Sequence, residues 1–365
     1  MKQRSVLRLL ASLTLTLLTL TAQATWYPAL QPEKQQLLIH SATDEQAMRP
    51  ALLDFQQLYP EVSIEYLDLG TLPLMQRFLA NAEQQKTADI IISSAMDLQI
   101  KLINDGNALT HDSETARALP AWTQWRKQAF SFTYEPIVMV YNKRLLAADK
   151  VPQSRLELIS LLRDQSAYFQ GKVGTYDIER SGLGYLLASQ DAQQASTWGR
   201  LTENFSQINF KGYANTQSML DAVRSGELLI AYNVLGSYAQ LETNKHPDLA
   251  IIFPSDYTLV VSRVAFISKY APNPAIAHHF MDYLLSQRGQ QLLAEQARLY
   301  SLHPDISGEA TYQGIQKLSR ERVPLKVIKL SPALLTYQDQ LKKRSFLEEW
   351  QKLLPATPQL PTTSR

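Results

Sequence analysis

The sequence has 365 residues, of which 45% are hydrophobic, and a formal net charge of +2. This length allows two domains of ordinary size, and the near-neutral charge argues against a nucleic-acid or anionic-membrane partner, which would need a basic surface. There is no cysteine, so disulfides, thiolate metal sites and cysteine nucleophiles are excluded.

The first 24 residues form a predicted secretory signal peptide. They combine three positive side chains, a largely apolar run from Leu9 to Leu20 and an A-x-A cleavage site that ends at Ala24. The run is short for a spanning helix and no stop-transfer pattern follows, which makes a retained membrane anchor the weaker interpretation. We therefore expect a mature chain that begins near Thr25, carries a net charge of about −1 and folds outside the cytoplasm.

Strands and helices alternate in the first third of the chain. Apolar runs and helical spacing of apolar residues distinguish the two kinds of element. The predicted strands are 36–40, 62–66 and 88–92, and the predicted helices are 48–58, 74–82 and 98–103. Three strand–helix units in succession predict a parallel sheet with helices on its faces.

Two long extended apolar runs, 132–141 and 259–267, bracket the middle of the chain. Further strands at 172–176, 228–232 and 249–254 lie between them, with a helix opening at Asn233. This pattern predicts an α/β protein of two lobes joined by crossing strands. We expect the first lobe at 25–135 and 257–345, the second lobe at 136–256, and a tail at 346–365.

Polar residues recur where predicted strands end and helices begin. In open α/β sheets, ligands bind at this edge, and helix N-termini attract anions. A single Ser or Thr there is most simply a helix cap, but the recurrence in both lobes predicts a cleft for a phosphate or carboxylate. The candidate ligand-binding residues are Ser41, Thr43, Ser93, Ser94, Glu135, Arg180, Ser181, Gly182, Tyr232 and Asn233.

Three of these candidates carry specific chemistry. Arg180 is expected to clamp the anion with two hydrogen bonds, and a surface ion pair is its alternative role. Glu135 lies at the first crossing, where its carboxylate could accept ligand hydroxyls or cap a hinge. Tyr232 could stack on a sugar or pack in the core.

Catalytic and metal-binding motifs are missing from the sequence. There is no G-x-S-x-G elbow, no H-E-x-x-H pair, no Walker loop and no dinucleotide fingerprint. A hydrolase that uses Glu135 or Asp177 as acid or base is the alternative, but it needs a second suitably placed carboxylate, and no such pair is evident. We therefore expect no enzyme activity, no cofactor and no resident metal.

Four stretches carry a resemblance to a known family: Ser41–Asp44, Ala88–Asp97, Tyr134–Asn142 and Arg180–Gly184. Their order and spacing resemble type II bacterial periplasmic solute-binding proteins, in the branch of ferric-ion, sugar-phosphate and phosphoglycerate binders. The Ser-Ser-Ala-Met-Asp stretch and the Glu-Pro crossing look closest to phosphoglycerate-transport regulatory proteins. The resemblance implies a two-lobed fold with a ligand cleft that closes about a hinge, and a monomer.

The same resemblance suggests what is bound. Ferric-binding members typically hold the metal with two adjacent tyrosines after a second-lobe strand, whereas this chain has Tyr232 followed by Asn233. The missing phenolate favours a small, phosphorylated organic anion over iron. The implied partner is an ABC permease in the inner membrane. The alternatives are a regulatory protein that presents the bound ligand to a two-component sensor kinase, and a ferric-iron-binding protein.

Overall fold

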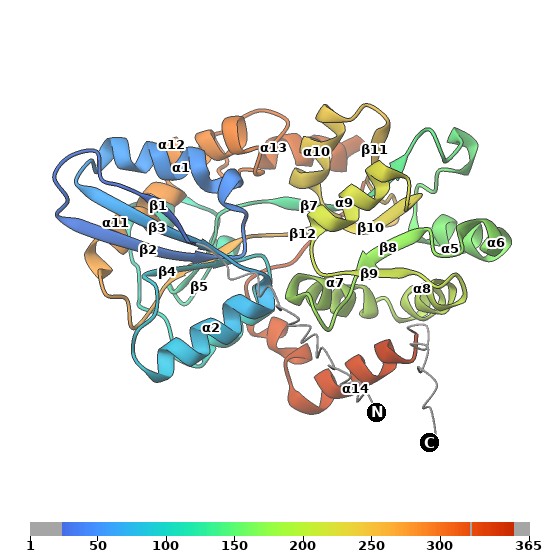
Figure 1. Ribbon diagram of the computed structural model, residues 1–365, viewed down its shortest axis with the longest axis horizontal. Helices are drawn as coiled ribbons and strands as arrows, with labels where there is room; N and C mark the ends of the chain where they lie inside the picture. The colour runs from blue at the N-terminus through green and yellow to red at the C-terminus, as the bar shows by residue number, and fades with distance from the viewer. Residues whose placement is uncertain (1–23, 322, 354–365) are drawn as a thin grey trace, which may run out of the picture.

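The computed structural model describes residues 24–321 and 323–353 and places two α/β lobes side by side (Figure 1). Each lobe is built on one seven-stranded sheet. The predicted signal peptide lies outside the described residues except for Ala24. Within the described part of the chain, no helix combines the length and the apolar character needed to cross a bilayer.

The first sheet has the strand order β1-β3-β2-β4-β13-β6-β5. Strands β2, β3 and β4 are parallel, as predicted, whereas β13 is antiparallel to β4. The loops that follow these three parallel strands therefore lie at one edge of the sheet. The strands are β1 Thr25–Tyr27, β2 Gln35–Ser41, β3 Val62–Asp68, β4 Ile90–Ser93, β5 Gln124–Trp125, β6 Ala129–Ser131 and β13 Val264–Ile267.

The second sheet has the order β14-β12-β7-β10-β8-β9, and β11 also pairs with β7. The long strand β7 is antiparallel to β10, β11 and β12, whereas β10, β8 and β9 are parallel to one another. The ends of these parallel strands again share one edge. The strands are β7 Glu135–Asn142, β8 Val173–Tyr176, β9 Lys211–Tyr213, β10 Ile230–Leu235, β11 Leu249–Ile252, β12 Thr258–Val261 and β14 Leu325–Val327.

Helices cover the sheets of both lobes. In α1, Met48, Leu52 and Phe55 recur at helical spacing and are fully buried in the core of the first lobe. The first lobe contains α1 Glu45–Leu58, α2 Thr71–Glu83, α3 Met96–Asn104, α4 Glu114–Ala118, α11 Pro274–Leu285, α12 Gln287–Leu292 and α13 Tyr312–Glu321, with the 3-10 helix η1 Ala121–Thr123 and the π-helix η3 Leu293–Ala297. The second lobe contains α5 Arg155–Asp164, α6 Ser166–Phe169, α7 Gly182–Ala192, α8 Ala195–Gln207, α9 Thr216–Ser225 and α10 Gly236–Lys245, with the short turn η2 Ala148–Lys150.

The chain passes between the two sheets at residues 132–134, after β6, and again at residues 262–263, between β12 and β13. These two segments, which we call the hinge, are hydrogen-bonded to each other. The N–H of Phe132 donates to the carbonyl of Arg263 at 3.0 Å, and the N–H of Arg263 donates to the hydroxyl of Thr133 at 2.8 Å. The chain crosses once more between α13 of the first lobe and β14 of the second sheet, so rotation of one lobe against the other would bend the hinge and this connection.

Two predicted elements differ from the structure. The run 259–267, expected as one strand, forms β12 and β13 in different sheets, because the hinge residues interrupt it. Strand β10 continues past Asn233, which adopts a left-handed φ of 64° at an irregularity in the pairing with β7. The helix expected to open at Asn233 therefore begins at Gly236.

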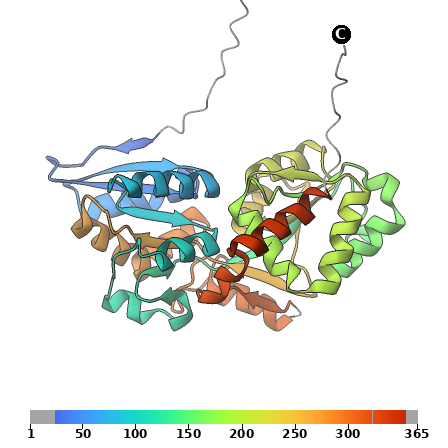
Figure 2. The same cartoon turned by 90° about the horizontal axis from the view of Figure 1, so that it is seen from below.

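The C-terminal segment consists of η4 Pro332–Tyr337, which packs against α3 of the first lobe, and α14 Gln340–Gln351, which lies against the second lobe (Figure 2). Phe346 and Trp350 of α14 stack on Trp198 of α8, with ring centroids 6.0 and 6.3 Å apart. The expected lobe boundaries differ from the structure in this region, because they grouped residues 257–345 with the first lobe and began a tail at residue 346. In the structure, β12 and β14 belong to the second sheet, and two aromatic residues four positions apart fix α14 to that lobe.

Candidate ligand-binding site

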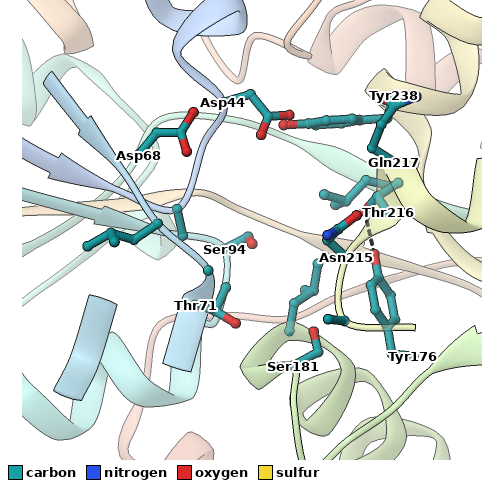
Figure 3. Close-up of a pocket in the computed structure, with 16 residues that line it drawn as sticks. Asp44, Asp68, Thr71, Ser94, Tyr176, Ser181, Asn215, Thr216, Gln217 and Tyr238 are labelled. Atoms are coloured by element: carbon teal, nitrogen blue, oxygen red, sulfur yellow. Dashed lines mark hydrogen bonds between the residues drawn. The ribbon is translucent and has the colours of Figure 1, made fainter. Parts of the chain in front are cut away.

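A cavity of about 250 Å³ lies between the lobes, at the edges where the parallel strands end (Figure 3). The first lobe contributes the loops after β2, β3 and β4, and the second lobe contributes the end of β8 and the starts of α7, α9 and α10. The polar lining residues are Asp44, Asp68, Thr71, Ser94, Tyr176, Ser181, Asn215, Thr216, Gln217 and Tyr238.

Helix N-termini from both lobes meet at this cavity. Gly70 and Thr71 begin α2 on one side, and Ser181 and Asn215 are the N-caps of α7 and α9 on the other. The hydroxyl of Ser181 accepts from the N–H of Gly184 at 3.1 Å, and the side-chain oxygen of Asn215 accepts from a backbone N–H of α9 at 2.9 Å. The partial positive charge of these helix ends favours an anionic group in the cavity.

The side chains of the cavity carry the opposite charge. Asp44 and Asp68 contribute two carboxylates, and no lysine, arginine or histidine is among the described residues that line it. Burial raises the pKa of Asp68, although its carboxylate accepts a hydrogen bond from the N–H of Glu45 at 3.1 Å. The cavity is therefore bipolar, with carboxylates in the first lobe and helix ends on both sides.

Tyr238 faces Asp44 across the cleft from the opposite lobe (Figure 3). Burial raises the pKa of the Tyr238 hydroxyl, Arg263 beneath it lowers that pKa, and Asp44 raises it. The hydroxyl thus stays protonated at neutral pH and can donate. Tyr176 is a second neutral phenol, whose oxygen lies 2.5 Å from the hydroxyl of Thr216.

The lobes touch directly beside the cavity. The N–H of Gly182, the first residue of α7, donates to the hydroxyl of Thr71 in α2 at 2.8 Å. A Cβ at Gly182 would lie 2.7 Å from a methyl carbon of Leu98 and 3.3 Å from the Cβ of Ala95, both in the first lobe. The absence of a side chain at this position therefore allows the two lobes to approach.

The structure brings some of the predicted site residues together. Ser94 and Ser181 line the cavity from opposite lobes, and Gly182 forms the contact beside them. Ser41 and Ser93 are buried behind the lining, where each hydroxyl accepts a hydrogen bond from a backbone N–H two residues ahead, at 2.9 and 3.1 Å. These two serines shape the loops that carry the cavity wall.

Thr43 and Glu135 belong to a buried cluster at the hinge. Arg263, only 1% exposed, pairs with the carboxylate of Glu135 and donates from Nε to the hydroxyl of Thr43 at 2.9 Å. Two roles were expected for Glu135: to accept ligand hydroxyls or to cap a hinge. Its pairing with Arg263 is a contact within the hinge. Arg263 was not among the residues selected from the sequence. Its place inside an apolar run could have identified it, because a buried charge requires a partner.

Tyr232 and Asn233 lie in the core of the second lobe. The hydroxyl of Tyr232 accepts from Arg155 at 2.7 Å and donates to Asp191 at 2.8 Å, and the amide of Asn233 donates to Asp191 at 2.9 Å. These groups do not line the interlobe cavity. Arg180 is exposed and also lies outside the lining.

Several lining residues were not selected from the sequence. Asp44, Asp68 and Thr71 follow predicted strands of the first lobe, and Asn215 and Tyr238 lie near helix starts in the second. Like Ser94, they lie where a strand ends or a helix begins, which we call the strand-end rule. Their position in the sequence could therefore have identified them. Among the described residues, no group of three or more His, Asp or Glu side chains is arranged to hold a metal ion.

Comparisons with known proteins agree with this architecture. The family model described as bacterial extracellular solute-binding protein matches residues 52–314. A substrate-binding protein of the ABC transporter from Agrobacterium tumefaciens is 34% identical, with a TM-score of 0.87 over 92% of this chain and 99% of that chain. No curated protein matches the sequence significantly.

Two more distant structures share the fold. The periplasmic binding protein AfuA from Actinobacillus pleuropneumoniae, solved with fructose-6-phosphate, is 16% identical, with a TM-score of 0.73 over 89% of this chain and 100% of that chain. Iron-bound HitA from Pseudomonas aeruginosa is 17% identical, with a TM-score of 0.69 over 88% of this chain and 99% of that chain. The predicted two-lobed periplasmic-binding fold is confirmed, and the chain belongs to the family of bacterial extracellular solute-binding proteins.

Proposed function

We propose that this protein captures a small phosphorylated polyol in the interlobe cavity and delivers it from the periplasm to an ABC permease. The observation that carries the proposal is the bipolar cavity, in which helix N-termini from both lobes face two carboxylates. The relative from Agrobacterium tumefaciens, described as part of an ABC transporter, supports the transport role, and the fructose-6-phosphate bound to AfuA supports the ligand class.

Each part of such a solute has a matching group in the cavity. The phosphate would accept hydrogen bonds from backbone N–H groups and hydroxyls at the starts of α7 and α9, which need no basic side chain to hold an anion. The polyol hydroxyls would donate to Asp44 and Asp68 in charge-assisted hydrogen bonds. Because like charges repel, the phosphate would lie on the side away from these carboxylates.

Capture follows from the hinge. A solute that contacts both lobes stabilises the closed arrangement, because it gains more contacts there than in an open one. The segments 132–134 and 262–263 would bend, and the Gly182–Thr71 contact would form as the lobes meet.

A small organic cation is the second candidate ligand. It is favoured by one observation, namely that the lining has two carboxylates and no basic side chain among the described residues. An amine would bind near Asp44 and Asp68 and make no use of the helix N-termini.

Thermal shift and calorimetry with a defined panel test the proposal. The panel contains glucose 6-phosphate, 3-phosphoglycerate, glucose, inorganic phosphate, putrescine and ferric citrate. We expect the phosphorylated compounds to raise Tm more than glucose or phosphate alone, because a ligand that binds only the folded state stabilises it. A shift with putrescine alone, with ferric citrate alone or with none of the compounds would contradict the proposal.

Deletion of the gene tests the transport role. If the protein serves a permease, loss of the protein abolishes uptake of the solute even when the permease is expressed from another promoter. The regulatory alternative predicts the reverse result, in which forced expression of the permease restores uptake.

A further inference from the structure

A second cavity, of about 240 Å³, lies between the lobes beside the first. It shares three lining residues with the first cavity: Asp44 from the first lobe, and Gln217 and Tyr238 from the second. Its other walls come from α1 and η3 on one side and α10 on the other. The interlobe cleft therefore has two chambers, and the three shared residues form the junction between them.

The second chamber has a different chemistry from the first. Three carboxamides face it, from Gln46, Gln217 and Gln296, together with the aliphatic side chains of Leu241 and Leu299. A carboxamide both donates and accepts hydrogen bonds, so it matches a hydroxyl, which does the same. Aliphatic side chains and the ring of Tyr238 can cover the apolar face of a sugar.

The charges of the second chamber favour a neutral occupant. Glu242, which is buried, lies 3.8 Å from the ammonium group of Lys245 and 3.6 Å from the ring of His246. Its carboxylate thus has basic neighbours already, so a cation would gain little from it. Lys245 is the basic side chain in the lining, and it already lies beside Glu242. The starts of α9 and α10 reach this chamber only through the junction residues Gln217 and Tyr238, so a second phosphate would have to share the seat of the first.

We infer that the solute spans both chambers and is a phosphorylated sugar extended by a neutral glycosyl unit. This inference rests on the proposed function, because the phosphorylated part occupies the first chamber. The glycosyl unit occupies the second, and the linkage passes the junction at Asp44, Gln217 and Tyr238. A solute of this length contacts both lobes twice, which would stabilise closure more than a monosaccharide phosphate can.

Calorimetry with paired ligands tests the inference. Glucose 6-phosphate is compared with three disaccharide phosphates: trehalose 6-phosphate, sucrose 6-phosphate and maltose 6′-phosphate. We expect at least one disaccharide phosphate to bind tenfold or more tightly than glucose 6-phosphate. The double variant Gln46→Ala, Gln296→Ala should weaken that binding about ten- to a hundredfold, since each of the two lost hydrogen bonds is worth about three- to tenfold, and should leave glucose 6-phosphate binding unchanged.

Matched controls separate the possible outcomes. Gln46 and Gln296 are exposed, so their replacement leaves the core intact, and Gln57→Ala changes an exposed glutamine of α1 that lines neither chamber. If glucose 6-phosphate binds and none of the three disaccharide phosphates exceeds it, the inference is overturned while the proposed function stands. Tighter binding of glycerophosphocholine than of every disaccharide phosphate would also overturn it. If no phosphorylated compound binds, the proposed function itself fails.

Discussion

The carboxylate of Asp44 affects the two parts of the proposed ligand in opposite ways: it accepts hydrogen bonds from hydroxyls and repels phosphate. We predict that Asp44→Asn weakens glucose 6-phosphate binding about tenfold, because a hydrogen bond to a charged group is replaced by one to a neutral amide. The same change should leave inorganic phosphate binding unchanged or stronger, since a repelling carboxylate is gone. Asp44 is the N-cap residue of α1, but its side chain makes no capping hydrogen bond, so α1 should be preserved. Calorimetry on both ligands measures the effect.

Arg180→Ala is the control for Asp44→Asn. Arg180 is exposed and lies outside the lining of the cavity, so its removal should change both affinities less than twofold. A tenfold loss in this variant would mean that Arg180 reaches the ligand, as its sequence position suggests.

Glu135 is the buried partner of Arg263 at the hinge. We predict that Glu135→Gln lowers the free energy of unfolding by about 3–5 kcal/mol, because it leaves a buried guanidinium without a counter-charge. Chemical denaturation measures the loss. The exposed pair of Lys101 and Asp105 provides the comparison, and Asp105→Asn should cost less than about 1 kcal/mol. Equal losses in the two variants would show that the hinge pair contributes no more than a surface pair.

At the scale of elements, the start of α7 controls how closely the lobes approach. We predict that Gly182→Ala weakens solute binding at least tenfold, because a Cβ there would lie 2.7 Å from Leu98 and 3.1 Å from the hydroxyl of Thr71. The folded protein should not lose stability, since alanine is a better helix former than glycine. Small-angle scattering with saturating solute should show a larger radius of gyration than in the wild type.

Gly199 of α8 is the matched control for this helix position. It is exposed, and a Cβ there would meet nothing within 4 Å. Gly199→Ala should therefore raise the free energy of unfolding by about 0.5–1 kcal/mol and leave affinity and closure unchanged. If Gly182→Ala behaves in the same way, the approach of the lobes does not depend on that glycine.

The elements of the first lobe could be predicted from local pattern, whereas the crossings could not. Apolar spacing predicts β2, β3 and β4 and the helices between them, because each buries one face in its own lobe. The run 259–267 has the same apolar character in both of its strands. Its division depends on Arg263, Glu135 and Thr133, which are distant in sequence and meet only in the folded chain.

The candidate site shows the same limit. The strand-end rule places Ser94 and Ser181 at the cavity, since backbone topology alone decides where those loops lie. It does not decide which way a long side chain turns, and Arg180 is exposed and lies outside the lining. Tyr232 also follows the rule, but Arg155 and Asp191 bind its hydroxyl inside the second lobe, and nothing near Tyr232 in the sequence indicates those partners.

At the scale of the whole molecule, the C-terminal segment bridges the two lobes. Its helix α14 packs on the second lobe, while Gln338 donates to the carboxylate of Asp97 in α3 of the first lobe at 2.5 Å. Asp97 is buried, and its other carboxylate oxygen has no hydrogen-bond partner among the described residues. Burial raises the pKa of Asp97 to about 6, against the opposing effects of Gln338 and of the nearby Lys343.

This buried carboxyl makes stability depend on pH in a definite direction. The folded state holds its proton up to about pH 6, whereas the unfolded chain releases it near pH 4, so ionisation of Asp97 costs stability as pH rises through that window. Asparagine can accept the same hydrogen bond and cannot ionise. We predict that Asp97→Asn raises the free energy of unfolding by about 3 kcal/mol at pH 7.5 and changes it little at pH 4.

Urea unfolding of the wild type and the variant across pH 4 to 8 measures the difference. Asp112→Asn is the control, because Lys127 and Arg117 hold the pKa of that exposed carboxyl below its usual value, so its removal should give no gain at high pH. A constant difference between Asp97→Asn and the wild type at every pH would mean that Asp97 does not titrate in this window. A gain that grows with pH would show that ionisation of Asp97, the buried carboxyl that accepts a hydrogen bond from Gln338 of the C-terminal segment, costs stability.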